Sequence, residues 1–116
     1  MDHQTVEAYI LSMPNTVLAY PFGKDVAVYK VAPAGSGEGK MFALIAVGSD
    51  PVRLSLKGDP QLNVLLREKY ETVMPGYHLN KKHWNTIVLS GQLSLDEVQD
   101  LIRHSYILVT QGPDAT

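Results

Sequence analysis

Apolar residues recur at helical spacing in three parts of the chain. The first such pattern predicts a helix over residues 2–13, and Pro14 ends it because proline cannot donate the backbone hydrogen bond that would continue a helix. The buried stripe of this helix follows the spacing i, i+3, i+4, i+7 and consists of Val6, Tyr9, Ile10 and Met13.

Two further helices carry recognisable start signals. Asp59 and Pro60 supply an N-cap followed by a proline at the first helical position, and this helix is expected to extend to Tyr70. Ser94 and Glu97 form a capping box for the last helix. The predicted core positions of these two helices are Leu62, Leu65 and Leu66, then Leu95, Val98, Leu101, Ile102 and Val109.

Strand patterns occupy the segments between the helices. Residues 26–31 and 40–47 are rich in β-branched and aromatic side chains, and the glycine-rich residues 33–39 connect them as a hairpin link. After the second helix we expect a short extended piece at 77–79, a turn at 80–82 and a strand at 84–89. Trp84 begins this strand and is predicted to be buried.

Residues 52–57 alternate between apolar and polar side chains. Val52, Leu54 and Leu56 are predicted to point into the core. The outward residues are Arg53, Ser55 and Lys57. Such alternation indicates a sheet with one face in water.

The element order is α-β-β-β-α-β-β-α, with hairpin-length links and no alternation of strand and helix. This order predicts an α+β fold of two layers, in which an antiparallel sheet has helices packed on one face. We expect a single domain over residues 1–110, followed by a flexible tail at 111–116.

Composition narrows the classes of function. The chain has 116 residues, 45% of them apolar and 19% charged, as in ordinary globular proteins. Cysteine is absent, which excludes disulfides and thiol catalysis and is compatible with a reducing cytoplasm. No signal peptide is visible, and the longest apolar run is too short to span a bilayer. The net charge of −2 means that any nucleic-acid site must depend on a local basic patch.

Candidate catalytic, phosphate and metal sites lack essential parts. The glycine-rich loop precedes a strand, whereas a phosphate-binding loop requires a helix after it. His78 and His83 have no carboxylate or cysteine near them in the sequence to complete a metal site. Ser90 and Ser94 have no recognisable catalytic partner. We therefore expect a non-enzymatic protein without metal or cofactor.

Polar and aromatic residues gather between residues 77 and 86. Lys81 and Lys82 can neutralise phosphates, and Asn80 and Asn85 can hydrogen-bond a nucleic-acid backbone or base edge. Further candidates for nucleic-acid contact are Tyr77, His78, His83 and, flanking the other hairpin, Lys30 and Lys40. The structural alternative is that Asn80 holds a left-handed turn, the lysines are only solvated and Trp84 anchors the core.

This segment also resembles the signature of the MmcQ/YjbR-like family of small bacterial proteins. The matching features are the Pro75 to His78 entry, residues 80–86 (NKKHWNT), Gly91, the end of the last helix at 105–109 and the corner at 20–23. The likeness covers roughly residues 1–110. It implies a sheet layout similar to frataxin-like proteins and secretion chaperones, and DNA binding through a double wing of hairpins.

Three functions remain open on this sequence. The first is salt-sensitive DNA binding through the hairpin around residues 80–85 and the hairpin with Lys30 and Lys40. The second is a protein-interaction adaptor that uses the open sheet face or an edge strand. The third is a small-molecule site near Tyr77, His78 and Trp84. The oligomeric state is undetermined, with a monomer favoured.

Overall fold

The computed structural model of the protein describes residues 1–32 and 39–111. The predicted glycine-rich connection lies outside the described residues except for Gly39, and the predicted tail lies outside them except for Gln111. Within the described ranges, none of the helices combines the length and apolar character needed to cross a membrane.

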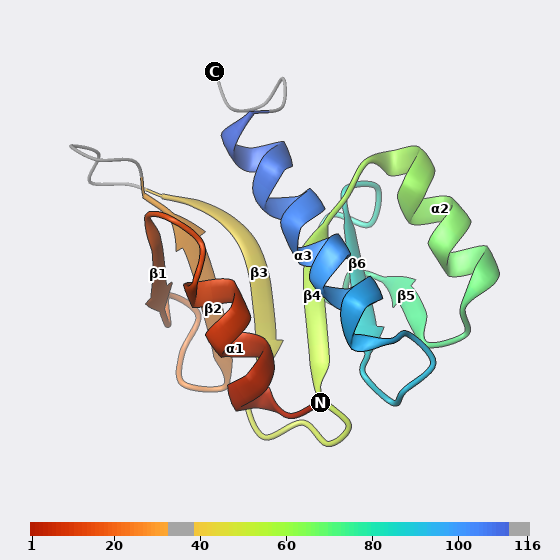
Figure 1. Ribbon diagram of the computed structural model, residues 1–116, viewed down its shortest axis with the longest axis horizontal. Coiled ribbons are helices and arrows are strands. Elements are labelled where there is room, and N and C mark those ends of the chain that lie inside the picture. The colour runs from red at the N-terminus through yellow and green to blue at the C-terminus, as the bar shows by residue number, and fades with distance from the viewer. Residues whose placement is uncertain (33–38, 112–116) are drawn as a thin grey trace.

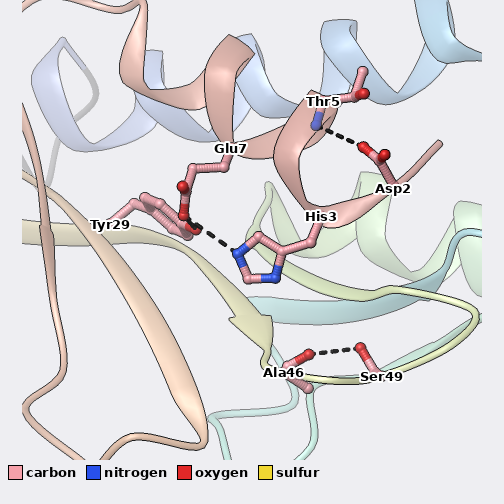
Figure 2. Close-up of polar contacts among 7 residues, drawn as sticks. All are labelled: Asp2, His3, Thr5, Glu7, Tyr29, Ala46 and Ser49. Atoms are coloured by element: carbon pink, nitrogen blue, oxygen red, sulfur yellow. Dashed lines mark hydrogen bonds and ion pairs between the residues drawn. The ribbon is translucent and has the colours of Figure 1, made fainter.

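Three helices form close to the predicted positions, and the capping signals of the second and third are confirmed. Their bounds are α1 His3–Leu11, α2 Pro60–Lys69 and α3 Leu95–Thr110. The Asp2 carboxylate accepts the Thr5 N–H at the start of α1 (Figure 2), and Asp59 caps α2 in the same way. Ser94 and Glu97 form the predicted capping box of α3. The caps satisfy backbone N–H groups that have no partner within the helix.

The strands form one antiparallel sheet of six strands in the order β1-β2-β3-β4-β6-β5. Their bounds are β1 Thr16–Ala19, β2 Val26–Val31, β3 Lys40–Ala46, β4 Arg53–Lys57, β5 Val73–Pro75 and β6 Trp84–Val88. In Figure 1, α1 and α3 lie across the front of the sheet, and α2 lies at the side of β5 and β6. The predicted α+β class, with helices on one face of an antiparallel sheet, is confirmed.

Two strands differ from the predicted pattern. The pattern does not predict β1, because this edge strand has only four residues and exposes Val17 and Leu18, so its burial does not alternate. β5 lies before the turn rather than at 77–79. An extended piece at 77–79 is wrong because His78 has a φ of 57°, in the left-handed region where a strand cannot continue.

The main core lies between the sheet and helices α1 and α3. Its least exposed large members are Tyr29, Phe42, Ile45, Leu54 and Ile87 from the strands and Val6, Ile10, Val98 and Ile102 from the helices. Leu65 is 60% exposed and Leu95 43% exposed, so both predicted core positions are wrong. Leu95 is the first residue of its helix, beyond the edge of the core, and α2 buries Asn63 in place of Leu65.

A polar contact fixes α1 on the sheet. The buried Tyr29 hydroxyl donates to Glu7 Oε2, and His3 Nε2 lies 3.3 Å from the same oxygen (Figure 2). Burial raises the pKa of the Tyr29 hydroxyl above its ordinary value, and the Glu7 carboxylate raises it further. Tyr29 therefore stays neutral and acts as the donor that pairs the strand with the helix.

The opposite side of the sheet, called here the open face, is covered by no described helix (Figure 1). It carries a second apolar cluster of Val28, Leu44 and Trp84, with Val26, Met41 and Leu79 packed against it. These strand residues alternate with main-core residues such as Ala27 and Tyr29, which places them on the other side. Trp84 is 7% exposed, so its predicted burial is confirmed.

Candidate functional site

The loop of residues 76–83 that joins β5 to β6 is built on backbone hydrogen bonds. The Gly76 N–H donates to the Trp84 carbonyl at 2.9 Å, and a Cβ on Gly76 would lie 2.7 Å from Trp84 Cβ. Only glycine therefore fits this position. Lys81 Nζ donates back to the Gly76 carbonyl at 3.1 Å, and Asn80 Oδ1 accepts the Lys82 N–H at 2.9 Å. Asn80 thus forms a local turn, while the left-handed residue is His78.

Helix α2 is hydrogen-bonded to the same loop through the Asn63 side chain. The buried Asn63 side chain donates to the carbonyls of Gly58 and Lys82 at 3.1 and 3.2 Å. Asn85 Nδ2 donates to the Asn63 carbonyl at 3.2 Å, and Asn85 is only 3% exposed. A surface role of Asn85 in contacting bases is therefore wrong, because its side chain is buried and its Nδ2 donates inside the protein.

Other predicted residues of this segment reach solvent. Tyr77 is 67% exposed, and its ring centroid lies 4.0 Å from that of His78 at an interplanar angle of 55°. Lys81 and Lys82 are exposed, and His83 is half-buried. These side chains share one loop, as the sequence predicts, although Trp84 lies beneath the surface.

The two predicted lysines of the other hairpin do not share a face. Lys30 pairs with Met41, which packs against the open-face cluster, whereas Lys40 pairs with Val31, which belongs to the main core. Directly paired residues lie on the same face of an antiparallel sheet, and successive residues lie on opposite faces. Lys30 and Lys40 therefore flank the hairpin as predicted, but only Lys30 lies on the open face.

The open face contains a hollow of about 500 Å³. It lies between the 76–83 loop and the central strands, and we call it the open-face hollow. It is lined by Phe22, Val26, Leu44, Ala46, Arg53, Ser55, Met74, Tyr77, His78, Leu79 and Thr86. Tyr77 and His78, two residues of the sequence-predicted site, therefore line a concavity rather than a flat surface.

Two buried hydroxyl groups form the polar part of this hollow. Ser55 Oγ and Thr86 Oγ1 lie 2.8 Å apart on neighbouring strands, and the Tyr77 N–H donates to Thr86 Oγ1 at 3.1 Å. The hydroxyl pair thereby holds the loop on the sheet. Arg53 is exposed at the rim, and no ion pair joins it to an acid among the described residues.

Charge is distributed unevenly over the elements, because the helices carry both signs of charge and the strands carry only one. Every charged residue on the six described strands is a cation: Lys30, Lys40, Arg53 and Lys57. Of these, Lys30, Arg53 and Lys57 lie on the open face by their pairing and alternation. The described acids lie on helices, helix caps and loops. The strands therefore contribute only positive charge to the open face, although the net charge of the protein is −2.

The sequence analysis missed Arg53 as a site residue, although the alternation of residues 52–57 already placed it outward. Phe22 and Met74 carried no signal of their own, because only the fold brings them together. No group of three or more potential metal ligands occurs within the parts of the chain that the structure describes.

Comparison with known proteins gives consistent matches. The family model described as YjbR matches residues 11–108. The uncharacterized protein YbdF of Escherichia coli O157:H7 is 34% identical over 110 residues, which cover 95% of this chain and 85% of YbdF. The uncharacterized protein YjbR of Escherichia coli K12 is 38% identical over 69 residues, 60% of this chain and 58% of YjbR.

Two solved structures share the fold. Deinococcus radiodurans protein DR2400, described as domain DUF419, superposes with a TM-score of 0.87 at 37% identity, over 93% of this chain and 78% of DR2400. A Pseudomonas syringae protein superposes with a TM-score of 0.73 at 31% identity, over 90% of this chain and 96% of that one.

Proposed function

This chain belongs to the YjbR family, and we propose that it binds single-stranded nucleic acid, without catalysis, on the open face of its sheet. The observation that carries the proposal is the charge of the strands, which hold cations and no acid. Phosphate groups supply most of the affinity of non-specific nucleic-acid binding, and they need only a surface of locally positive charge. The net charge of −2 then lowers the affinity without preventing binding.

Exposed rings favour a single strand over a duplex. Phe22 is 63% exposed and Tyr77 67% exposed, and both line the open-face hollow beside Arg53. Unpaired bases stack on such rings whatever their sequence, whereas bases inside a duplex are already stacked on one another. A duplex would contact the same face only through its phosphates.

The loop lysines extend this surface. Lys81 uses one of its ammonium hydrogens for the Gly76 carbonyl and keeps the others for a phosphate. Lys82 is exposed at the end of the loop nearest to α2. We therefore expect Lys30 and Arg53 to contribute more than Lys81 and Lys82, because the first two lie on the open face itself.

Fluorescence anisotropy with labelled oligonucleotides tests the proposal. The intact protein should bind a single strand more tightly than the duplex of the same sequence, with a non-specific Kd on the order of 10⁻⁴ to 10⁻⁶ M. The Lys30→Ala/Arg53→Ala double variant should weaken binding and reduce the salt slope by about 0.7 for each phosphate that the protein no longer neutralises. The matched control Lys69→Ala/Arg103→Ala removes the same charge from the helices and should keep the slope.

Absence of binding by the intact protein at low salt would contradict the proposal. The adaptor hypothesis would then lead, since β1 is an edge strand that exposes Val17 and Leu18. Equal losses in the two double variants would also contradict it, because the effect would then come from net charge rather than from the open face.

A further inference from the structure

We propose that the open-face hollow is a binding site for a small organic anion with an aromatic or branched apolar body. This inference goes beyond nucleic-acid binding. It concerns a free small molecule seated between the 76–83 loop and strands β3, β4 and β6. The hollow, at about 500 Å³, has the size of many small-molecule sites, which occupy roughly 300–1,000 Å³.

The hydroxyl pair at the hollow has one hydrogen to spare. Thr86 Oγ1 accepts the Tyr77 N–H, and a single hydrogen bond joins Thr86 to Ser55. Two hydroxyl groups carry two hydrogens, and that bond uses one of them. Whichever oxygen donates, the other hydroxyl keeps a hydrogen with no acceptor among the described atoms. Ser55 is 9% exposed and Thr86 3% exposed, and both line the hollow, so the remaining donor is available to an acceptor atom of a ligand there.

The walls suit an apolar body. Leu44, Met74 and Leu79 provide aliphatic surface, and Phe22 and Tyr77 provide rings at the rim. A ligand ring placed there would cover apolar surface that is now exposed to water, and its burial would supply most of the binding free energy.

The charge at the rim selects an anion. Arg53 lines the hollow without an ion-pair partner among the described acids, and His78 of the 76–83 loop also lines it. None of the described residues that line the hollow is acidic. A carboxylate, sulfonate or phosphate that reaches Arg53 would be attracted, whereas an ammonium group would be repelled by the Arg53 guanidinium.

A titration observed by nuclear magnetic resonance tests the site with two probes that share one ring system, naphthalene-1-sulfonate and neutral naphthalene-1-methanol. Trp84 packs against Leu44 and Leu79, two residues of the lining, and it is the only tryptophan of the chain. Its single indole N–H resonance therefore reports on the hollow. We expect saturable shifts of this resonance and of the Thr86 and Tyr77 amides with both probes, and tighter binding of the sulfonate.

Two variants separate the charge from the apolar walls. Arg53→Gln should weaken the sulfonate by about two- to fivefold, as expected for an exposed charge pair, and leave the neutral alcohol unchanged. Ala46→Phe should fill the hollow and abolish binding of both probes. The control Ala8→Phe makes the same substitution on the exposed side of α1 and should leave both affinities intact. Cooperative thermal unfolding of each variant establishes that it remains folded.

Other results would overturn the inference. Shifts that gather at Val64 and Leu65, or binding that survives Ala46→Phe, would place the probes in the shallow depression on the outer side of α2. Equal affinity for the two probes would contradict the proposal that the hollow prefers an anion. The titration contains no oligonucleotide, so its outcome is independent of nucleic-acid binding. If both activities exist, the sulfonate should compete with the single strand, because both use Arg53 and Tyr77.

Discussion

At the scale of single residues, several polar side chains that look functional in the sequence act as structural parts. Asn85 is buried against Asn63, Asn80 forms a turn, and Glu97 closes the start of α3. Trp84 is also a structural residue, because it is buried with Val28 and Leu44 in the apolar cluster of the open face. The exposed Tyr77, His78, Lys81 and Lys82 are left as the residues of this segment that can contact a ligand.

Truncation of Trp84 should be costly. Trp84→Ala removes a large ring that is 7% exposed, and we expect a loss of about 3–5 kcal/mol in the free energy of unfolding. Urea denaturation measures it. Trp84→Phe keeps part of the ring and should cost less. An unchanged midpoint in the alanine variant would mean that the ring contributes nothing to the second cluster.

Glu97 should make the free energy of unfolding depend on pH in the acid range. The backbone N–H of Ser94 and then the Tyr70 hydroxyl stabilise its carboxylate, which lowers the pKa of Glu97 below its ordinary value of 4.5. The ionised form therefore stabilises the folded state at pH above 4.5, and this contribution is lost as pH falls through the lowered pKa. Denaturation of wild type and Glu97→Gln should show a constant difference above that pH and a shrinking one below it.

A difference between wild type and Glu97→Gln that stays constant throughout the acid range would contradict this assignment. Asp96→Asn is the control, since Asp96 also lies in the first turn of α3, whereas the capping box with Ser94 uses Glu97. Its variant should follow the wild-type dependence on acid more closely.

At the scale of elements, the sequence predicted those features that depend on neighbouring residues, namely helix caps and strand positions. The caps of α2 and α3 and the strands at 26–31 and 84–88 follow from hydrogen-bonding side chains and from apolar spacing. The exposure of Leu65 could not be predicted in this way. It depends on the Asn63 side chain, which donates to the carbonyls of Gly58 and of Lys82, a residue distant in sequence. Strand β1 was not predicted for a similar reason, since it is a strand only through its backbone pairing with β2.

Asn63 should control the order of the 76–83 loop. Asn63→Ala leaves the carbonyls of Gly58 and Lys82 without their donor, and an unsatisfied buried group costs about 1–3 kcal/mol. Amide hydrogen exchange at His83 and Trp84 should quicken beyond what the global loss of stability explains. Gln61→Ala, on the exposed side of the same helix, is the control and should leave both amides protected.

At the scale of the whole molecule, the class of fold was predictable and the candidate site was predictable only in part. Hydrophobic patterns predict the helices, most of the strands and most of the buried faces, and the α+β sheet with helices on one side follows from them. The open-face hollow combines Phe22, Arg53, Met74 and Thr86 with the loop that begins at Gly76. These positions are distant in sequence, so no local pattern joins them.

The strands carry cations and no acid, so charge is distributed unevenly over the molecule, which gives it an electric dipole. A dipolar protein turns its positive side toward a polyanionic surface even when its total charge is negative, because the nearest charges dominate within a Debye length of about 10 Å. At neutral pH, this protein of net charge −2 should therefore be retained by immobilised heparin. Lys30→Glu/Arg53→Glu should elute early, whereas Lys69→Glu/Arg103→Glu, with the same net charge, should elute close to wild type. If the two variants eluted together, retention on heparin would depend on total charge alone, and the position of the cations on the molecule would have no effect.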